Sequence, residues 1–150
     1  MASGKGNTNA AGLLQAMFQA TFSDLTTFLA NSASPATNLY ISLHTANPGA
    51  TGNQGTSEAA YNGYVRIAVV RTNVGWTLTA ESITNAAAIT FAQANATGTP
   101  ETETYVGIGE SGTTHDSGTL LWFGALTATL IVNPGITPSF AIGQLSVTEA

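Results

Sequence analysis

The feature that most constrains the fold is a change of hydrophobic period at Pro35. From there to the C-terminal end, short runs of alternating apolar and polar residues are separated by Gly, Asn and Pro, which is typical of strands and turns. In the first run, Leu39, Ile41 and Leu43 recur every second residue, so we expect one face of this strand to pack inward. We expect strands near residues 38–45, 63–71, 76–79, 87–91, 104–109, 120–132 and 141–148.

Before Pro35 the period is helical. Leu14, Phe18 and Phe22 recur at four-residue intervals, which predicts one amphipathic helix over residues 11–31. The preceding residues 1–10 are polar and rich in Gly and Asn, and we interpret them as an extended arm.

The chain length of 150 residues predicts a single domain with a core of its own. The absence of cysteine excludes disulfides and thiolate sites, so packing must supply the stability. Together these patterns predict a mainly β fold: a jelly-roll-like antiparallel β-sandwich over residues 38–148 with one N-terminal amphipathic helix.

Charged residues make up 7% of the chain, against about 25% in ordinary soluble domains. A surface of Thr, Ser, Asn, Gly and Ala can be buried against a partner at lower cost than a charged one, so we expect a homo-oligomer, a dimer or a trimer. Lys5, Arg66 and Arg71 are the only Lys or Arg residues, and the net charge is −5. This balance argues against nucleic acid as a partner. No window is apolar enough for a membrane span and no signal peptide is evident, so we expect no membrane partner and synthesis in a host cytoplasm.

A Gly-x-Gly-x-x-Gly motif lies at residues 107–112, after a predicted strand. Dinucleotide binding would require a helix to begin at this loop, whereas the sequence continues with turn-forming residues. We therefore favour a glycine-rich β-turn, and we expect no cofactor.

The sequence gives little support for catalysis or for metal binding. The two histidines, His44 and His115, are not part of a recognisable nucleophile motif, and His115 lies beside Asp116 in a predicted turn. Glu101, Glu103, Glu110 and Asp116 could surround a calcium ion if their loops converged, but solvated acids are the simpler interpretation. Mutual repulsion between Glu101 and Glu103 is as plausible as chelation. We expect no enzymatic activity and no metal.

Contact residues are expected on the N-terminal arm, the helix, two long loops at 46–57 and 92–103, and the strand that carries the arginines. Arg66 and Arg71 could each pair with a partner's carboxylate or, equally, with an internal acid such as Glu58 or Glu81. The aromatic residues are expected to lie mostly in the core, with a carbohydrate-binding platform as the alternative. The interface candidates are Lys5, Leu14, Phe18, Phe22, Asn47, Asn53, Gln54, Arg66, Arg71 and Asn95.

Several sequence blocks, in the order in which they follow one another, resemble those of a known protein family. The helix is followed by Asn-Leu-Tyr-Ile-Ser-Leu-His-Thr-Ala-Asn-Pro-Gly at 38–49, by Thr-Ser-Glu-Ala-Ala-Tyr-Asn-Gly-Tyr-Val-Arg at 56–66, and by Val-Gly-Ile-Gly at 106–109. Over residues 13–148 the chain resembles small tailed-phage virion proteins, labelled tail-fibre-like or similar to capsid cement (decoration) proteins. The resemblance implies a jelly-roll-like domain on the outer surface of the capsid, bridging major capsid protein subunits. The alternative is a tail- or fibre-associated adsorption protein that binds host polysaccharide. A third possibility, a cell-wall enzyme, would require paired carboxylates.

Overall fold

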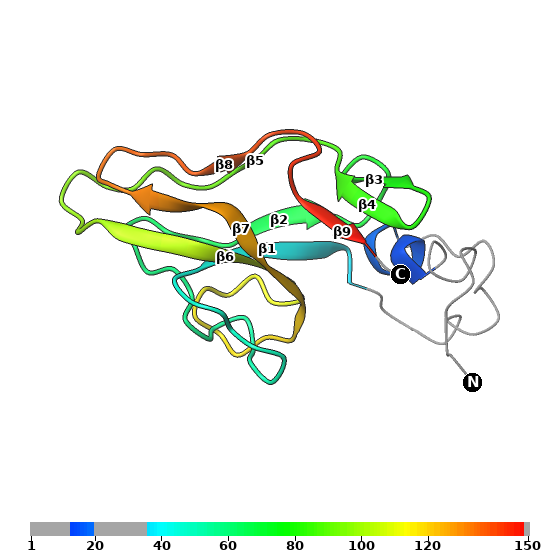
Figure 1. The fold of residues 1–150 in the computed structure, drawn as a ribbon, viewed down its shortest axis with the longest axis horizontal. Helices are drawn as coiled ribbons and strands as arrows, with labels where there is room; N and C mark the ends of the chain where they lie inside the picture. The colour runs from blue at the N-terminus through cyan, green and yellow to red at the C-terminus, as the bar shows by residue number, and fades with distance from the viewer. Residues whose placement is uncertain (1–12, 20–35, 149–150) are drawn as a thin grey trace. The chain divides into compact units, whose positions relative to one another are not determined.

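The structure is a computed structural model, and it describes residues 13–19 and 36–148. Over these residues the chain is mainly β, with three antiparallel sheets, which confirms the predicted mainly β, sandwich-like class (Figure 1). The strands are β1 (Asn38–His44), β2 (Ile67–Val70), β3 (Trp76–Thr79), β4 (Ser82–Asn85), β5 (Ile89–Thr90), β6 (Glu101–Gly109), β7 (Leu120–Val132), β8 (Ser139–Phe140) and β9 (Ser146–Thr148).

A short helical segment, the π-helix η1 (Gln15–Gln19), is the described part of the helix predicted over 11–31. Leu14 and Phe18, on the predicted apolar face, are fully buried. The rest of that helix and the arm at 1–10, which include Lys5 and Phe22, lie outside the described residues.

The contacts divide the chain into two compact units. The first comprises Met1–Asn38, Val70–Ile89 and Phe140–Ala150, and the second comprises Leu39–Val69 and Thr90–Ser139. The single domain expected over 1–150 stays a prediction.

The first unit contains the three-stranded sheet β3-β4-β9. A two-residue turn joins β3 to β4, with Thr79 opposite Ser82, and Ala80 in this turn has a positive φ of 52°. The core residue is Trp76, which is fully buried and packs edge-to-face against Phe18 with ring centroids 4.4 Å apart. Arg71 donates hydrogen bonds to the backbone carbonyls of Met17 and, at 2.6 Å, of Ala36, so this arginine joins the helix segment to the start of the β region.

The second unit is built on the four-stranded sheet β2-β1-β6-β7. The strand β6 lies between β1 and β7, with Ile41 opposite Ile108 and Gly107 opposite Phe123 (Figure 1). Leu39, Ile41 and Leu43 of β1 are buried, as predicted. The expectation that a single face of this strand packs inward is wrong, however, because Ser42 and His44 on its other face are also fully buried. Both faces of β1 are therefore core, and the second face buries polar groups.

Candidate functional site

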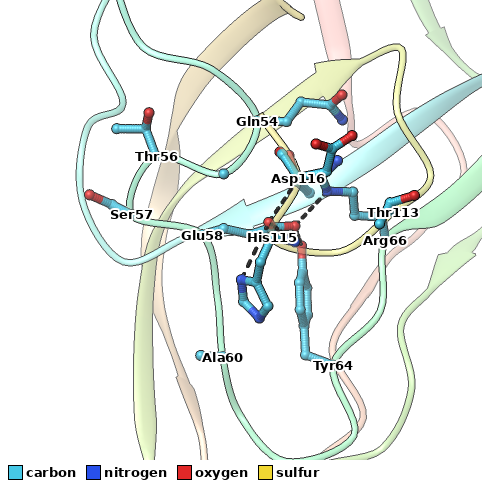
Figure 2. A network of polar contacts seen from close by, with 12 residues as sticks. Gln54, Thr56, Ser57, Glu58, Ala60, Tyr64, Arg66, Thr113, His115 and Asp116 are labelled. Atoms are coloured by element: carbon cyan, nitrogen blue, oxygen red, sulfur yellow. Dashed lines mark hydrogen bonds and ion pairs between the residues drawn. The ribbon is translucent and has the colours of Figure 1, made fainter. Parts of the chain in front are cut away.

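The most developed polar cluster of the second unit is centred on Glu58 and Arg66. Glu58 lies just after the loop at 46–57, where backbone hydrogen bonds from Thr45 to Ser57 and from Ala59 to Leu43 attach the chain to β1. Arg66 lies just before β2. The Arg66 guanidinium donates from Nε to Glu58 Oε1 at 2.6 Å and from Nη2 to Glu58 Oε2 at 2.8 Å, and both side chains are buried (Figure 2). This bidentate geometry is the strongest form of an ion pair between side chains.

The same pair holds the loop between β6 and β7. Arg66 also donates from Nη1 to the carbonyl of Ser111 at 2.9 Å and from Nη2 to the carbonyl of Asp116 at 2.8 Å. Glu58 Oε2 in turn accepts from the backbone N–H of His115 at 2.7 Å. Since each partner is satisfied on several sides, the desolvation that a buried ion pair normally costs is offset.

Tyr64 completes the cluster (Figure 2). Its hydroxyl donates to Glu58 Oε1 at 3.0 Å and accepts from the backbone N–H of Leu43 at 3.1 Å. Burial, followed by the charge of Glu58, raises the pKa of the Tyr64 hydroxyl, so it remains a proton donor. We call Glu58, Tyr64, Arg66 and the loop 110–118 the Glu58–Arg66 network.

Gln54 fixes the loop at 46–57 to the same β6–β7 loop. Its side-chain oxygen accepts from the Ser111 N–H at 2.8 Å, its Nε2 donates to the Ser111 carbonyl at 3.3 Å, and its own backbone N–H donates to the Gly118 carbonyl at 2.9 Å. The side chain is fully buried. The two loops are therefore joined to each other by side-chain and backbone hydrogen bonds.

The glycine motif at 107–112 has a structural explanation. A Cβ on Gly107 would lie 2.5 Å from His44 Nε2, and one on Gly109 would lie 2.2 Å from Gln54 Cδ. A Cβ on Gly112 would lie 2.5 Å from the ring of Tyr40. No helix follows the motif, so the hypothesis of a dinucleotide site fails. The glycines instead leave room for the side chains that pack against them. The signal in the sequence was the pair of glycines two residues apart within one strand, which indicates close approach on one face.

His44 and Ser42 form a buried pair beside Gly107. Ser42 Oγ and His44 Nε2 are 2.9 Å apart, and His44 Nδ1 lies 2.9 Å from the carbonyl of Thr56. Because a carbonyl only accepts, Nδ1 carries the proton and Nε2 accepts from Ser42. Burial lowers the pKa of His44, which favours this neutral form. Serine and histidine also pair in hydrolases, but both of these side chains have no exposed surface, so a substrate has no approach to them.

The four acids considered for calcium do not form a site. Glu101 accepts the backbone N–H groups of Ala60 and Tyr61 at 2.8 and 2.7 Å, and Asp116 accepts from Ser111 Oγ at 2.9 Å. In the part of the chain that the structure describes, no three His, Asp or Glu side chains gather as a metal would require.

Glu103 is an unusual member of this group. It is fully buried, and neither carboxyl oxygen has a well-aligned hydrogen-bond partner in the described ranges. Burial first, and then the neighbouring Glu101 carboxylate, raise the pKa of Glu103 to about 8. The sequence offered repulsion or chelation for this pair of acids; the charge of Glu101 does disfavour ionised Glu103, but burial is the larger cause of its raised pKa.

The predicted contact residues fall into three groups. Leu14, Phe18, Gln54 and Arg66 are buried within the chain, so they pack or bond internally instead of offering a contact surface, and for Arg66 the internal pairing with Glu58 is the one realised. Asn47 and Asn95 are exposed, while Asn53 and Arg71 are half-buried. The contact role of these four stays a prediction, and Lys5 and Phe22 lie outside the described residues.

In the part of the chain that the structure describes, the aromatic residues do not form an exposed platform. Tyr61 and Tyr64 are buried and pack edge-to-face with centroids 5.3 Å apart, and Tyr64 also stacks with Phe91 at 6.2 Å. Phe123 is the aromatic side chain with large exposure, at 39%, within the described ranges. A carbohydrate platform of several aromatic rings is therefore not supported.

The described helix is also too short to cross a membrane. The fold and the network define a β-rich protein whose buried polar groups fix its loops. The family comparison gives the class to which it belongs, structural proteins of bacteriophage virions. The chain belongs to the Gp80 family, described as podophage GP4 fiber I protein gp80, which matches residues 5–148. The resemblance to phage virion proteins is confirmed at this level. No curated protein matches the chain.

Proposed function

We propose that this chain is a non-catalytic structural subunit of the fibre or tail apparatus of a phage, which works by binding other virion subunits. The observation that carries the proposal is the family match, which spans residues 5–148 and whose description names a fiber protein. The low charge content supports it, because a surface with few ionised groups can be covered by protein at small desolvation cost.

The structural role fits the way the loops are held. The Glu58–Arg66 network and Gln54 use their polar groups on backbone atoms of the same chain, so they stiffen the loops at 46–57 and 110–118. Stiff loops lose little entropy when they dock on a neighbour. We infer protein contacts in preference to glycan adsorption, since Tyr61, Tyr64 and Trp76 are buried.

Capsid cement on the outer surface of the head is the second candidate, with the major capsid protein as the partner. The charge-poor surface favours it as much as it favours a fibre, because cement also acts through many modest interfaces at once. Neither role requires a cofactor, nucleic acid or a membrane.

Quantitative mass spectrometry of purified virions distinguishes the two roles. A fibre subunit is present in a small fraction of the copy number of the major capsid protein, whereas cement approaches it. Antibody labelling seen by electron microscopy gives the location independently, on the tail or over the head. Absence of the chain from purified particles would contradict both roles.

A further inference from the structure

The turn that precedes Tyr64 contains a chemically reactive pair of residues. Asn62-Gly63 is the only Asn-Gly sequence in the chain, and both residues are exposed. In such a pair the backbone nitrogen of the glycine can attack the side-chain amide carbon of the asparagine, because the two atoms belong to neighbouring residues and their bond closes a five-membered ring. Glycine has no Cβ to shield its nitrogen. The pair therefore carries the groups that spontaneous deamidation requires.

The fold requires glycine at position 63. The Tyr64 N–H donates to the Tyr61 carbonyl at 2.9 Å, which closes a turn around the pair, and Gly63 has a φ of 103° within it. A Cβ at this position would also lie 2.9 Å from the Gln93 carbonyl oxygen. A larger residue, which would protect Asn62 by shielding the next nitrogen, would therefore be strained and would clash.

The attacking nitrogen is not engaged by the fold. The Gly63 N–H donates to no acceptor among the described residues. Because Gly63 is also exposed, this N–H can lose its proton to solvent without breaking a hydrogen bond of the protein.

Asn95 holds the amide that is attacked. Its Nδ2 donates to Asn62 Oδ1 at 2.9 Å, and its backbone N–H donates to the Asn62 carbonyl at 2.8 Å. The first bond directs a donor at the oxygen on which negative charge develops when the amide carbon is attacked. The second bond fixes the backbone that carries this side chain. Asn95 is therefore placed to stabilise the intermediate of the reaction.

We propose that Asn62 is a site of spontaneous deamidation in the folded protein, promoted by Asn95. The Gly63 nitrogen loses its proton to solvent and forms a bond to Asn62 Cγ. The bond from Cγ to Nδ2 then breaks, and Nδ2 takes up a proton from water and leaves as ammonia. Water opens the resulting succinimide ring at one of its two carbonyls, which gives aspartate or isoaspartate. Nothing is oxidised or reduced, and water is the co-reactant.

The two products change the turn differently. Both make the net charge of −5 one unit more negative. Aspartate keeps the length of the main chain and an acceptor oxygen for Asn95. Isoaspartate adds a carbon to the main chain inside the turn that Tyr61 and Tyr64 close. The Tyr64 hydroxyl donates to Glu58, so isoaspartate loosens one attachment of the Glu58–Arg66 network.

The test is prolonged storage of the purified full chain in mildly alkaline buffer, followed by isoelectric focusing and peptide mapping by mass spectrometry. An acidic species should accumulate, with a mass increase at Asn62 equal to the difference between water and ammonia. Asn73 provides an internal comparison, because it is also exposed and in a turn but is followed by Val74, whose branched side chain shields the nitrogen. Asn62 should react at least about 10-fold faster than Asn73.

Variants separate the chemistry from a general effect of storage. Asn62→Gln should abolish the acidic species, because its longer side chain disfavours ring closure. Asn95→Ala should slow the reaction by about 10-fold, since the donor to the developing oxyanion is lost. The matched control is Gln93→Ala, which removes a nearby exposed amide that bonds to the Gly135 carbonyl and should leave the rate unchanged.

A second variant keeps the test decisive if Asn95→Ala does not fold. Asn95→Asp preserves the size of the side chain but accepts where the amide donates, so it should also slow the reaction. A chain that stays uniform, a chain that reacts first at another asparagine, or Asn95 variants that react as fast as the unmodified chain would overturn the proposal. This outcome is independent of where the chain resides in the virion.

Discussion

Arg66 donates hydrogen bonds to both oxygens of the Glu58 carboxylate, from Nε to Oε1 at 2.6 Å and from Nη2 to Oε2 at 2.8 Å, and both side chains are fully buried. Replacing Arg66 with Met leaves a buried carboxylate without its counter-charge and frees the carbonyls of Ser111 and Asp116. We expect the free energy of unfolding to fall by about 3–5 kcal/mol, measured by urea denaturation.

A double-mutant cycle provides the control for this prediction. The variant Glu58→Gln, Arg66→Met should lose much less than the sum of the two single changes, because neither buried charge is then left unpaired. Additive losses would show that the two side chains are not coupled.

The Gly107 position should not tolerate a side chain. We expect Gly107→Ala to destabilise the protein by about 1–3 kcal/mol, because the new Cβ would approach His44 Nε2 and Ser42 Oγ to 2.5 and 2.7 Å. Gly124→Ala is the matched control: it also replaces a strand glycine, yet its Cβ has nothing within 4 Å. Thermal unfolding compares the two, and equal effects would refute the close approach at Gly107.

The His44 pair should make stability depend on pH. Burial lowers the pKa of His44 in the folded state below its ordinary 6.5. As the pH falls below 6.5, the unfolded chain therefore takes up a proton before the folded one, and the contribution of neutral His44 to stability is lost. In His44→Gln, the free energy of unfolding should vary less with pH in this window than in the unmodified chain. The control is His115→Gln, at a histidine whose side chain is 54% exposed, which should retain the dependence.

Glu103 should act in the opposite direction. Its folded pKa of about 8 lies above the ordinary 4.5, so the folded state holds the proton more tightly. The protein should gain stability as the pH falls from about 8 toward 4.5. Glu103→Gln, which resembles the protonated acid, should be more stable at pH 7 by about 1–3 kcal/mol and should lose this dependence. Glu110→Gln, at an exposed acid just beyond the same strand, should leave it intact. A Glu103→Gln variant that is less stable at pH 7 would show that the carboxylate has a stabilising partner.

The strands with clear alternation were predictable from sequence. The bounds 76–79 and 120–132 agree with β3 and β7, and 38–45 differs from β1 by one residue. The strand β4 was missed because the turn before it, Ala80-Glu81, lacks the Gly or Asn that normally signals a two-residue hairpin. The expected strand at 63–71 begins only at Ile67, because the chain turns before it: Gly63 has a positive φ of 103° and the Tyr64 N–H donates to the Tyr61 carbonyl.

From the sequence, the partners in the Glu58–Arg66 network could be predicted only as a set of alternatives. The sequence offered Glu58 and Glu81 as internal partners of the arginines, but which acid meets Arg66 depends on contacts between segments far apart in the chain. The same holds for Gln54, whose polar side chain suggested a surface contact. Its burial depends on the backbone of Ser111, which no local pattern reveals.

The division into two units has a consequence for inheritance. Neither unit is a continuous stretch of sequence, because the chain enters and leaves the second unit twice. A single recombination crossover between the codons for Leu39 and Ser139 would therefore give both units parts from different parents. Exchange between related phages should preserve this protein only when the whole reading frame moves together.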